Sequence, residues 1–184
     1  MNENRFGLDG KVAVVTGALG KLGPIWTGAL LDAGACVLGI DHPDQTPGEA
    51  FLSLQKQFGA RRLRHASADV RKRAELEQAL DHCCEVFGIP NVLVNNAGID
   101  QPPDGPDGGY RLADIPLDIN RQVFEVNTLG LFLVSQVFGG AMAKAGRGSI
   151  INIGSLYASV APDSRLYEHI PSDPPILKPP ACLL

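Results

Sequence analysis

The chain has 184 residues, a formal net charge of −4 and an isoelectric point near 5.5, and 45% of its residues are hydrophobic. This length and composition are typical of one soluble globular domain with a sizeable core. The acidic balance argues against a nucleic-acid partner, since proteins that bind nucleic acids normally carry a basic surface.

Short apolar segments alternate with amphipathic segments along most of the chain. The apolar segments are rich in valine and isoleucine and lack a polar alternation, which is typical of parallel strands buried on both faces. The amphipathic segments carry apolar residues at helical spacing. The predicted order is strand 11–16, helix 24–33, strand 36–40, helix 49–58, strand 63–68, helix 72–87, strand 91–94, helix 118–144 and strand 148–154.

Strands that alternate with helices at these lengths predict an α/β fold with a doubly wound parallel sheet. Residues 100–109 are rich in proline and glycine and are predicted to form a loop. After residue 161 prolines become frequent, and no helix or strand pattern fits. We therefore expect one Rossmann-like domain over residues 1–161, followed by a proline-rich tail over residues 162–184.

A turn with glycines at 17, 20 and 23 joins the first predicted strand to the first predicted helix. Glycine allows a backbone to turn sharply and to approach a pyrophosphate, whose charge then lies at the N-terminus of the helix. Ordinary turns also use glycine, so from this pattern alone a dinucleotide-binding turn and a plain turn are equally good interpretations. Pro24 falls in the first turn of the helix, where its missing N–H is tolerated.

Three motifs follow one another at the ends of the first, fourth and fifth predicted strands. They are the glycine turn, the segment Asn95-Asn96-Ala97-Gly98, and the strand end Ile-Asn-Ile-Gly-Ser155. With these motifs in register, the chain resembles the short-chain dehydrogenase/reductase family up to residue 161. The resemblance implies a Rossmann-like fold, a nicotinamide dinucleotide as cofactor, and hydride transfer between the nicotinamide and a carbonyl or alcohol carbon.

The glycine turn departs from the family pattern Thr-Gly-x-x-x-Gly-x-Gly at one position. Lys21 stands where the pattern has its middle glycine, and a glycine lies one residue earlier. Lys21 is either a phosphate contact or an outward-pointing lysine. The resemblance implies that the turn contacts the cofactor through Gly17, Gly20, Lys21, Leu22 and Gly23.

Asp41 ends the second predicted strand. A carboxylate at this position accepts hydrogen bonds from the ribose hydroxyls of adenosine and repels a 2′-phosphate. Asp41 therefore favours NAD over NADP, although Lys21 argues the other way and a plain turn aspartate is the alternative. We expect the chain to bind NADH more tightly than NADPH.

The resemblance implies further cofactor contacts after the third and fourth strands. Asp69 and Val70 match the position that brackets the adenine, although Asp69 would also serve as a cap for the helix that begins near residue 72. Asn96, Ala97 and Gly98 resemble the segment that lines the adenosine ribose and steadies the sheet.

For catalysis the resemblance implies an asparagine, a serine, a tyrosine and a lysine. Asn127 matches the asparagine that carries a proton-relay water, and Ser155 matches the serine that orients the substrate oxygen. None of the three tyrosines has a lysine four residues later, so the family's Tyr-x-x-x-Lys motif is absent from the sequence. We expect a chain truncated before this motif, with negligible turnover on its own.

Full-length relatives carry further strands after this point, so the C-terminal part of the sheet is expected to be missing and the fifth strand to be an open edge. Relatives are usually homo-oligomers, and assembly of this chain stays open. The implied substrate is a small molecule such as a sugar, a polyol or a ketoacyl compound. A dinucleotide-binding pseudoenzyme and a non-functional remnant are the alternatives.

Targeting, membrane and metal signals are not found in the sequence. The first ten residues lack the apolar region of a secretory signal, and no uninterrupted apolar run reaches the ~18 residues of a membrane span. The four cysteines are spaced for neither a disulfide framework nor a metal site. A basic cluster, Arg61, Arg62 and Arg64, is interpreted as solvated loop charge. We expect a cytoplasmic protein without a metal or a membrane partner.

Overall fold

The computed structural model describes residues 6–99, 116–156, 159–160 and 165. It divides into two compact units, one formed by Met1–Ala97 with Gly130–Ile153 and the other by Gly98–Leu129 with Gly154–Leu184. The loop predicted at 100–109 and, apart from residue 165, the tail predicted at 162–184 lie outside the described residues.

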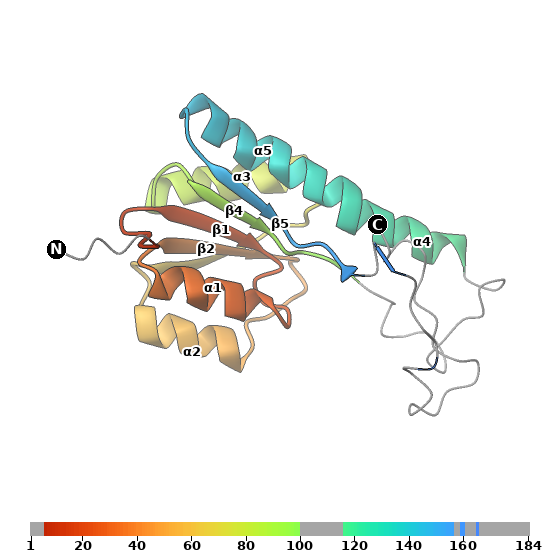
Figure 1. The fold of residues 1–184 in the computed structure, drawn as a ribbon, viewed down its shortest axis with the longest axis horizontal. Helices are drawn as coiled ribbons and strands as arrows, with labels where there is room; N and C mark the ends of the chain where they lie inside the picture. The colour runs from red at the N-terminus through yellow and green to blue at the C-terminus, as the bar shows by residue number, and fades with distance from the viewer. Residues whose placement is uncertain (1–5, 100–115, 157–158, 161–164, 166–184) are drawn as a thin grey trace. The chain divides into compact units, whose positions relative to one another are not determined.

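The first unit contains a five-stranded sheet in the order β3-β2-β1-β4-β5, and every adjacent pair is parallel (Figure 1). All five residues of the central strand β1 are buried, which agrees with its continuous apolar sequence. The strands are β1 (Val12–Thr16), β2 (Cys36–Asp41), β3 (Leu63–Ser67), β4 (Val92–Asn95) and β5 (Ser149–Asn152). The predicted doubly wound parallel sheet is confirmed.

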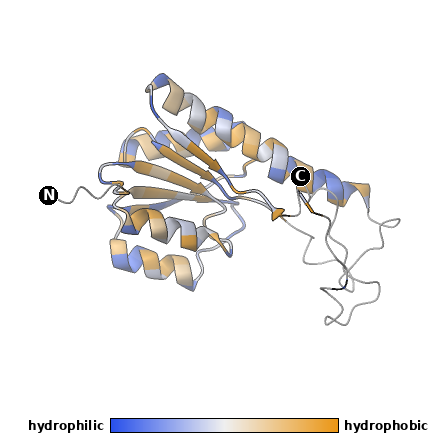
Figure 2. Ribbon diagram, in the orientation of Figure 1, coloured by the Kyte–Doolittle hydropathy of each residue, from blue (hydrophilic) through white to orange (hydrophobic). Residues whose placement is uncertain are grey.

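Helices cover both faces of this sheet. Figure 1 shows α1 (Gly23–Asp32) and α2 (Glu49–Phe58) on one face, and α3 (Arg73–Val86) and α5 (Leu131–Lys144) on the other. The strands between these layers are predominantly hydrophobic (Figure 2). The core is therefore made by the apolar faces of the helices packing on a sheet that is apolar on both sides.

The direction of strand order reverses next to β1. β2 lies next to β1 and β3 lies next to β2 at one edge of the sheet, whereas β4 pairs with the other side of β1. In open α/β sheets ligands bind outside the carboxyl ends of the strands at such a reversal, which here lies at the carboxyl ends of β1 and β4. The fold thus brings the glycine turn after β1 next to the Asn96 segment after β4.

The strand β5 forms an edge of the sheet within the described part of the chain, since it pairs with β4 alone. All four of its residues are exposed, and Ile150 and Ile151 keep 43% and 45% of their surface. An edge strand with exposed apolar side chains is open to pairing with another strand. This geometry agrees with the open edge expected from the sequence.

The single long helix predicted over residues 118–144 is interrupted. The structure has α4 (Leu117–Phe124), a π-helical segment (Glu125–Gly130) and α5 in succession. A π-helical turn holds one residue more than an α-helical turn, and such segments are frequent at functional sites. The hydrophobic pattern did not reveal it, because one wide turn hardly changes the spacing of apolar residues.

This helical run, Leu117–Lys144, is also long and apolar enough to cross a membrane by length and composition. A mostly buried core helix of a soluble protein meets the same criteria, and 28% of the apolar window of this run is buried among the described residues. The α5 part of the run packs against β4, β5 and α3 in the first unit. Length and composition alone therefore do not point to a membrane partner.

The interpretation of Arg62 as solvated loop charge was wrong. Its guanidinium donates hydrogen bonds to the carbonyl oxygens of Leu31, in the last turn of α1, and of Ala35, beyond its end, and lies 5.3 Å from the centroid of the Phe58 ring. Carbonyl groups at a helix C-terminus lack partners within the helix, and a cation there is favoured by the helix dipole. Arg62 therefore ties the end of α1 to the end of α2.

His65 on β3 makes the stability of the fold depend on pH. Burial lowers the pKa of His65 below its usual 6.5, and the Asp41 carboxylate opposes this shift only in part. Its Nε2 atom is buried without a hydrogen-bond partner among the described residues. The unfolded chain therefore takes up this proton more readily than the folded chain.

We expect the free energy of unfolding to be highest above pH 6.5 and to decrease as the pH falls through the lowered pKa of His65. Denaturant titrations between about pH 5 and 7 should show this loss. The His65→Leu variant should show a flatter profile over this range. The pKa of Asp69 is also lowered from its usual 3.8, chiefly by its hydrogen bond to Arg71, so its contribution is lost only at more acidic pH. An unchanged profile in the variant would contradict the assignment to His65.

Candidate functional site

The glycine turn after β1 is closed so tightly that two of its glycines have structural roles. Gly17 adopts φ +64°, a conformation that side chains rarely adopt. A Cβ atom on Gly23 would lie 2.2 Å from the carbonyl oxygen of Gly17. By contrast, a Cβ atom on Gly20 would meet that same oxygen at 3.4 Å, an ordinary contact. The turn therefore requires glycine at its two ends and tolerates a side chain in its middle.

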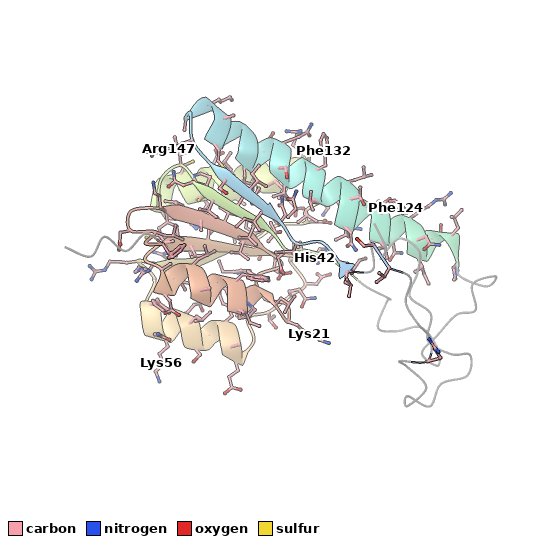
Figure 3. The ribbon with its side chains drawn as sticks, viewed as in Figure 1. Lys21, His42, Lys56, Phe124, Phe132 and Arg147 are labelled. Atoms are coloured by element: carbon pink, nitrogen blue, oxygen red, sulfur yellow. The ribbon has the colours of Figure 1, made fainter. Side chains whose placement is uncertain are left out.

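The turn leads directly into the N-terminus of α1. The N-cap residue Leu22 provides no side-chain hydrogen bond to the first turn, which also contains Pro24. Pro24 has no N–H group and the Ile25 N–H donates to the Leu22 carbonyl oxygen at 3.0 Å, so the attraction for an anion at this end comes from the Gly23 N–H and the helix dipole. Figure 3 shows the exposed Lys21 at the end of the sheet where the strands terminate. These features suit a phosphate-bearing ligand.

The turns after β1 and β4 are in direct contact. A Cβ atom on Gly17 would lie 2.8 Å from the Cα atom of Ala97. The Thr16 hydroxyl accepts hydrogen bonds from the backbone N–H groups of Asn96 and Ala97, each at 3.1 Å. The last side chain of β1 therefore fixes the backbone that follows β4.

The Asn96 side chain completes this connection. Its Nδ2 atom donates to the carbonyl oxygens of Thr16 and Gly17, each at 3.1 Å. Its Oδ1 atom accepts a hydrogen bond from the indole Nε1 of Trp26 on α1 at 3.0 Å. Asn96 thus connects the start of the glycine turn to the end of β4 and to α1.

Asp41 at the end of β2 is oriented by two backbone donors. Its Oδ2 atom accepts from the N–H of Leu19 in the glycine turn at 2.7 Å, and its Oδ1 atom accepts from the N–H of His42 at 2.8 Å. Each carboxylate oxygen has a further lone pair, so the group retains the capacity to accept from ribose hydroxyls. The expected acceptor therefore lies beside the glycine turn in a fixed orientation.

Asp69 does not act as the helix cap that was the alternative interpretation, because the N-cap of α3 is Lys72 and it makes no side-chain cap bond. The Asp69 carboxylate is 2% exposed and accepts hydrogen bonds from the backbone N–H and the guanidinium of Arg71. The His42 Nε2 atom lies 3.7 Å from Asp69 Oδ2. Its neighbour Val70 is buried. The predicted contact of Asp69 with an adenine amine stays a prediction.

The two residues expected to act in catalysis lie in the second unit. Asn127 is in the π-helical segment and forms a reciprocal pair with the backbone of Ile99, accepting from its N–H and donating to its carbonyl oxygen at 2.9 Å each. A Cβ atom on Gly98 would lie 3.4 Å from Asn127 Oδ1. Ser155 is exposed just beyond the end of β5.

A family profile described as short chain dehydrogenase matches residues 11–165. The chain belongs to the short chain dehydrogenase family. The match covers the carboxyl ends of β1 and β4 and both residues expected to act in catalysis. It also explains why the sequence motifs occur in register, since each marks one strand end of the same sheet.

Two curated members of the short chain dehydrogenase family illustrate the similarity. Momilactone A synthase from Oryza sativa subsp. japonica is 33% identical over 154 residues, which are 84% of this chain and 53% of the relative. D-threitol dehydrogenase from Mycolicibacterium smegmatis is 33% identical over 166 residues, which are 88% of this chain and 58% of the relative. The chain thus spans just over half the length of these relatives.

Solved structures agree with this membership. The crystal structure of an NAD⁺-bound xylitol dehydrogenase superposes with a TM-score of 0.73 at 26% identity, covering 84% of this chain and 56% of that chain.

Sequence patterns did not single out two residues that shape this short chain dehydrogenase site. Trp26 gave no signal, because its partner Asn96 lies 70 positions away and is brought close by the fold. Arg71 lies two residues from Asp69, and that close spacing of opposite charges was the available signal. The described residues contain no cluster of three or more histidine, cysteine, aspartate or glutamate side chains able to hold a metal ion.

Proposed function

We propose that this chain binds NAD at the carboxyl ends of β1 and β4, as the cofactor-binding part of an oxidoreductase. The observation that carries the proposal is the tight turn at Gly17 and Gly23, which places the uncapped N-terminus of α1 beside the carboxylate of Asp41. A helix N-terminus suits a phosphate, and a carboxylate suits the hydroxyls of an adenosine ribose. One dinucleotide carries both of these groups.

The residues at the carboxyl ends of β1 and β2 have the chemical groups that bind the phosphates and the adenosine ribose of NAD. The absence of a Cβ atom at Gly17 and Gly23 lets the turn close against its own backbone and that of Ala97, and the helix N-terminus would offset the charge of a pyrophosphate. Asp41 would accept from the ribose hydroxyls and disfavour a 2′-phosphate. When bound, the nicotinamide supplies a hydride donor or acceptor.

The substrate class we propose is a small alcohol or carbonyl compound such as a sugar, a polyol or a ketoacyl compound. The names of the D-threitol and xylitol dehydrogenases favour a polyol among these. In this proposal Ser155 orients the substrate oxygen, and Asn127 holds a water that passes a proton onward. The pairing of Asn127 with Ile99 leaves it one donor and one acceptor position for that water.

A second candidate function is dinucleotide binding without chemistry. Purified chain incubated with NAD⁺ and a panel of polyols distinguishes the two functions. NADH formation supports the oxidoreductase for this chain, whereas binding without NADH formation supports the second candidate and the expectation of negligible turnover.

The test of cofactor binding is a parallel titration of the 184-residue chain with NADH and NADPH. We expect NADH to bind more tightly and to raise the midpoint of thermal unfolding more at equal concentration. Tighter binding of NADPH would overturn the choice of cofactor. No binding of either dinucleotide would overturn the proposal itself.

The Asp41→Asn substitution should reduce this preference for NADH about tenfold, because it removes the charge that repels a 2′-phosphate. The amide oxygen still accepts from the Leu19 N–H, so the turn keeps its anchor. The Asp41→Ala variant serves as the matched comparison, since it loses both the charge and the acceptor. We expect weaker binding of both dinucleotides by Asp41→Ala, measured by the same titrations. An unchanged NADH preference in Asp41→Asn would contradict the role of the carboxylate.

A further inference from the structure

The single tryptophan of the chain contacts the proposed cofactor site through one hydrogen bond. Trp26 lies on α1, partly buried, and packs against the hydrophobic core cluster. Its indole Nε1 donates to the Oδ1 atom of Asn96 at 3.0 Å, across 70 positions in the sequence. A rigid ring anchored in the core therefore holds a polar side chain at the carboxyl end of β4.

This hydrogen bond fixes which way the Asn96 amide faces. An indole N–H is a donor only, so the atom it meets must be the amide oxygen. The amide nitrogen then faces the opposite side, where it donates to the carbonyl oxygens of Thr16 and Gly17. If the amide were turned over, its oxygen would face two carbonyl oxygens and its nitrogen would face the indole N–H. All three hydrogen bonds would be lost together.

The carbonyl groups held by Asn96 belong to the start of the glycine turn. Gly17 has the left-handed conformation from which the turn begins, and its carbonyl oxygen also accepts from the N–H of Gly20. The same oxygen is the nearest atom to a Cβ built on Gly23. The position of this one carbonyl group therefore determines the shape of the whole turn.

We infer that Trp26 is a positioning residue for the glycine turn at 17–23, acting through the amide of Asn96 on the Gly17 carbonyl. This inference rests on the proposed function, because the turn that Trp26 orders is the one proposed to bind NAD. The role needs the N–H group of the indole and is separate from the packing of the ring. An ordered turn loses less conformational freedom when the pyrophosphate binds, so the hydrogen bond favours binding.

The first test observes the hydrogen bond itself in the full chain. Because the sequence has one tryptophan, a ¹⁵N-labelled sample gives one indole N–H signal. We expect this proton to exchange with solvent far more slowly than that of free indole, and the protection to be lost in Asn96→Ala. Exchange at the rate of free indole in the unsubstituted chain would overturn the inference without any binding measurement.

The second test removes the N–H and keeps the ring. In a tryptophan auxotroph, β-(3-benzothienyl)alanine replaces Trp26 alone and substitutes a sulfur atom for the N–H group. We expect NADH affinity to fall about fivefold with little change in the unfolding midpoint, as for loss of one neutral hydrogen bond. In an Asn96→Ala background the same replacement should have no effect, since its partner is gone.

The two hypotheses fail in different ways. If the unsubstituted chain binds no dinucleotide, the proposed function fails, and indole exchange still reports on the contact. If the unsubstituted chain binds NADH and the benzothienyl chain binds it equally well, the positioning role fails while the proposed function stands. An equal loss of affinity in the presence and absence of the Asn96 side chain also overturns the role.

Discussion

The Gly23→Ala substitution is expected to weaken dinucleotide binding more than tenfold and to lower the free energy of unfolding by about 3 kcal/mol. The added Cβ atom would lie 2.2 Å from the carbonyl oxygen of Gly17 and 2.5 Å from the carbonyl carbon and oxygen of Ala18. All of these are backbone atoms, so no flexible side chain is available to move aside. The turn itself has to open.

Helix propensity alone predicts the opposite result, so a loss of stability in Gly23→Ala would point to the backbone clash. Gly23 is the first residue of α1, and replacing glycine by alanine in a helix normally stabilises it by up to about 1 kcal/mol. Gly20→Ala is the matched control in the same turn, because its Cβ atom would make only a 3.4 Å contact. Urea titrations and NADH titrations of the two variants provide the comparison. Similar values for both variants would show that the backbone clash does not govern the turn.

Phe51→Ala is expected to lower the free energy of unfolding by about 4 kcal/mol, the range typical of removing a buried aromatic ring. The ring is fully buried on α2. It lies beneath β2 at Gly39, where a Cβ atom would meet Ala18 Cβ at 2.8 Å and the Phe51 ring at 3.1 Å. The ring also makes an edge contact with His65, with centroids 6.0 Å apart. Its removal leaves a cavity directly under the glycine turn.

Because Phe51 supports Ala18 through Gly39, we expect the substitution also to weaken NADH binding at temperatures where the variant is folded. Phe51→Leu, which refills most of the volume, should cost less than about 1.5 kcal/mol. Leu52→Ala on the same helix is the surface control, since 51% of the Leu52 surface is exposed, and should stay within ~0.5 kcal/mol. Chemical denaturation monitored by circular dichroism measures all three. A Phe51→Ala loss no larger than that of Leu52→Ala would contradict the packing described here.

The alternating pattern of the sequence predicted the sheet well. Buried parallel strands carry their own signal in continuous apolar runs such as Val12–Thr16, and glycine marks where the chain turns at Gly17. Membership of the short chain dehydrogenase family was accordingly visible in residues that lie at strand ends. The position of Asp41 beside the glycine turn follows from the pairing of β1 with β2 and needed no contact information.

The remaining features were not predictable from hydrophobic periodicity and capping patterns, which do not specify side-chain pairing. Arg62 looks like any surface arginine until the end of α1 is placed beside it. Asp69 has the sequence of a helix cap, yet the neighbouring Arg71 occupies its carboxylate. The π-helical segment around Asn127 adds one residue to one turn, which periodicity does not detect. Arg62 is the case in which a tertiary contact decides the role of the side chain.

The hydrogen bond between Asp41 and the N–H of Leu19 has a thermodynamic consequence for the proposed seat. One carboxylate would face the adenosine ribose while it also anchors the turn that faces the pyrophosphate. Occupation of either part would then restrict the same group, so the binding free energies of the two halves of the dinucleotide would not be additive. By linkage this coupling is reciprocal: an adenosine fragment that improves binding of a diphosphate fragment is itself bound more tightly in its presence, by the same factor.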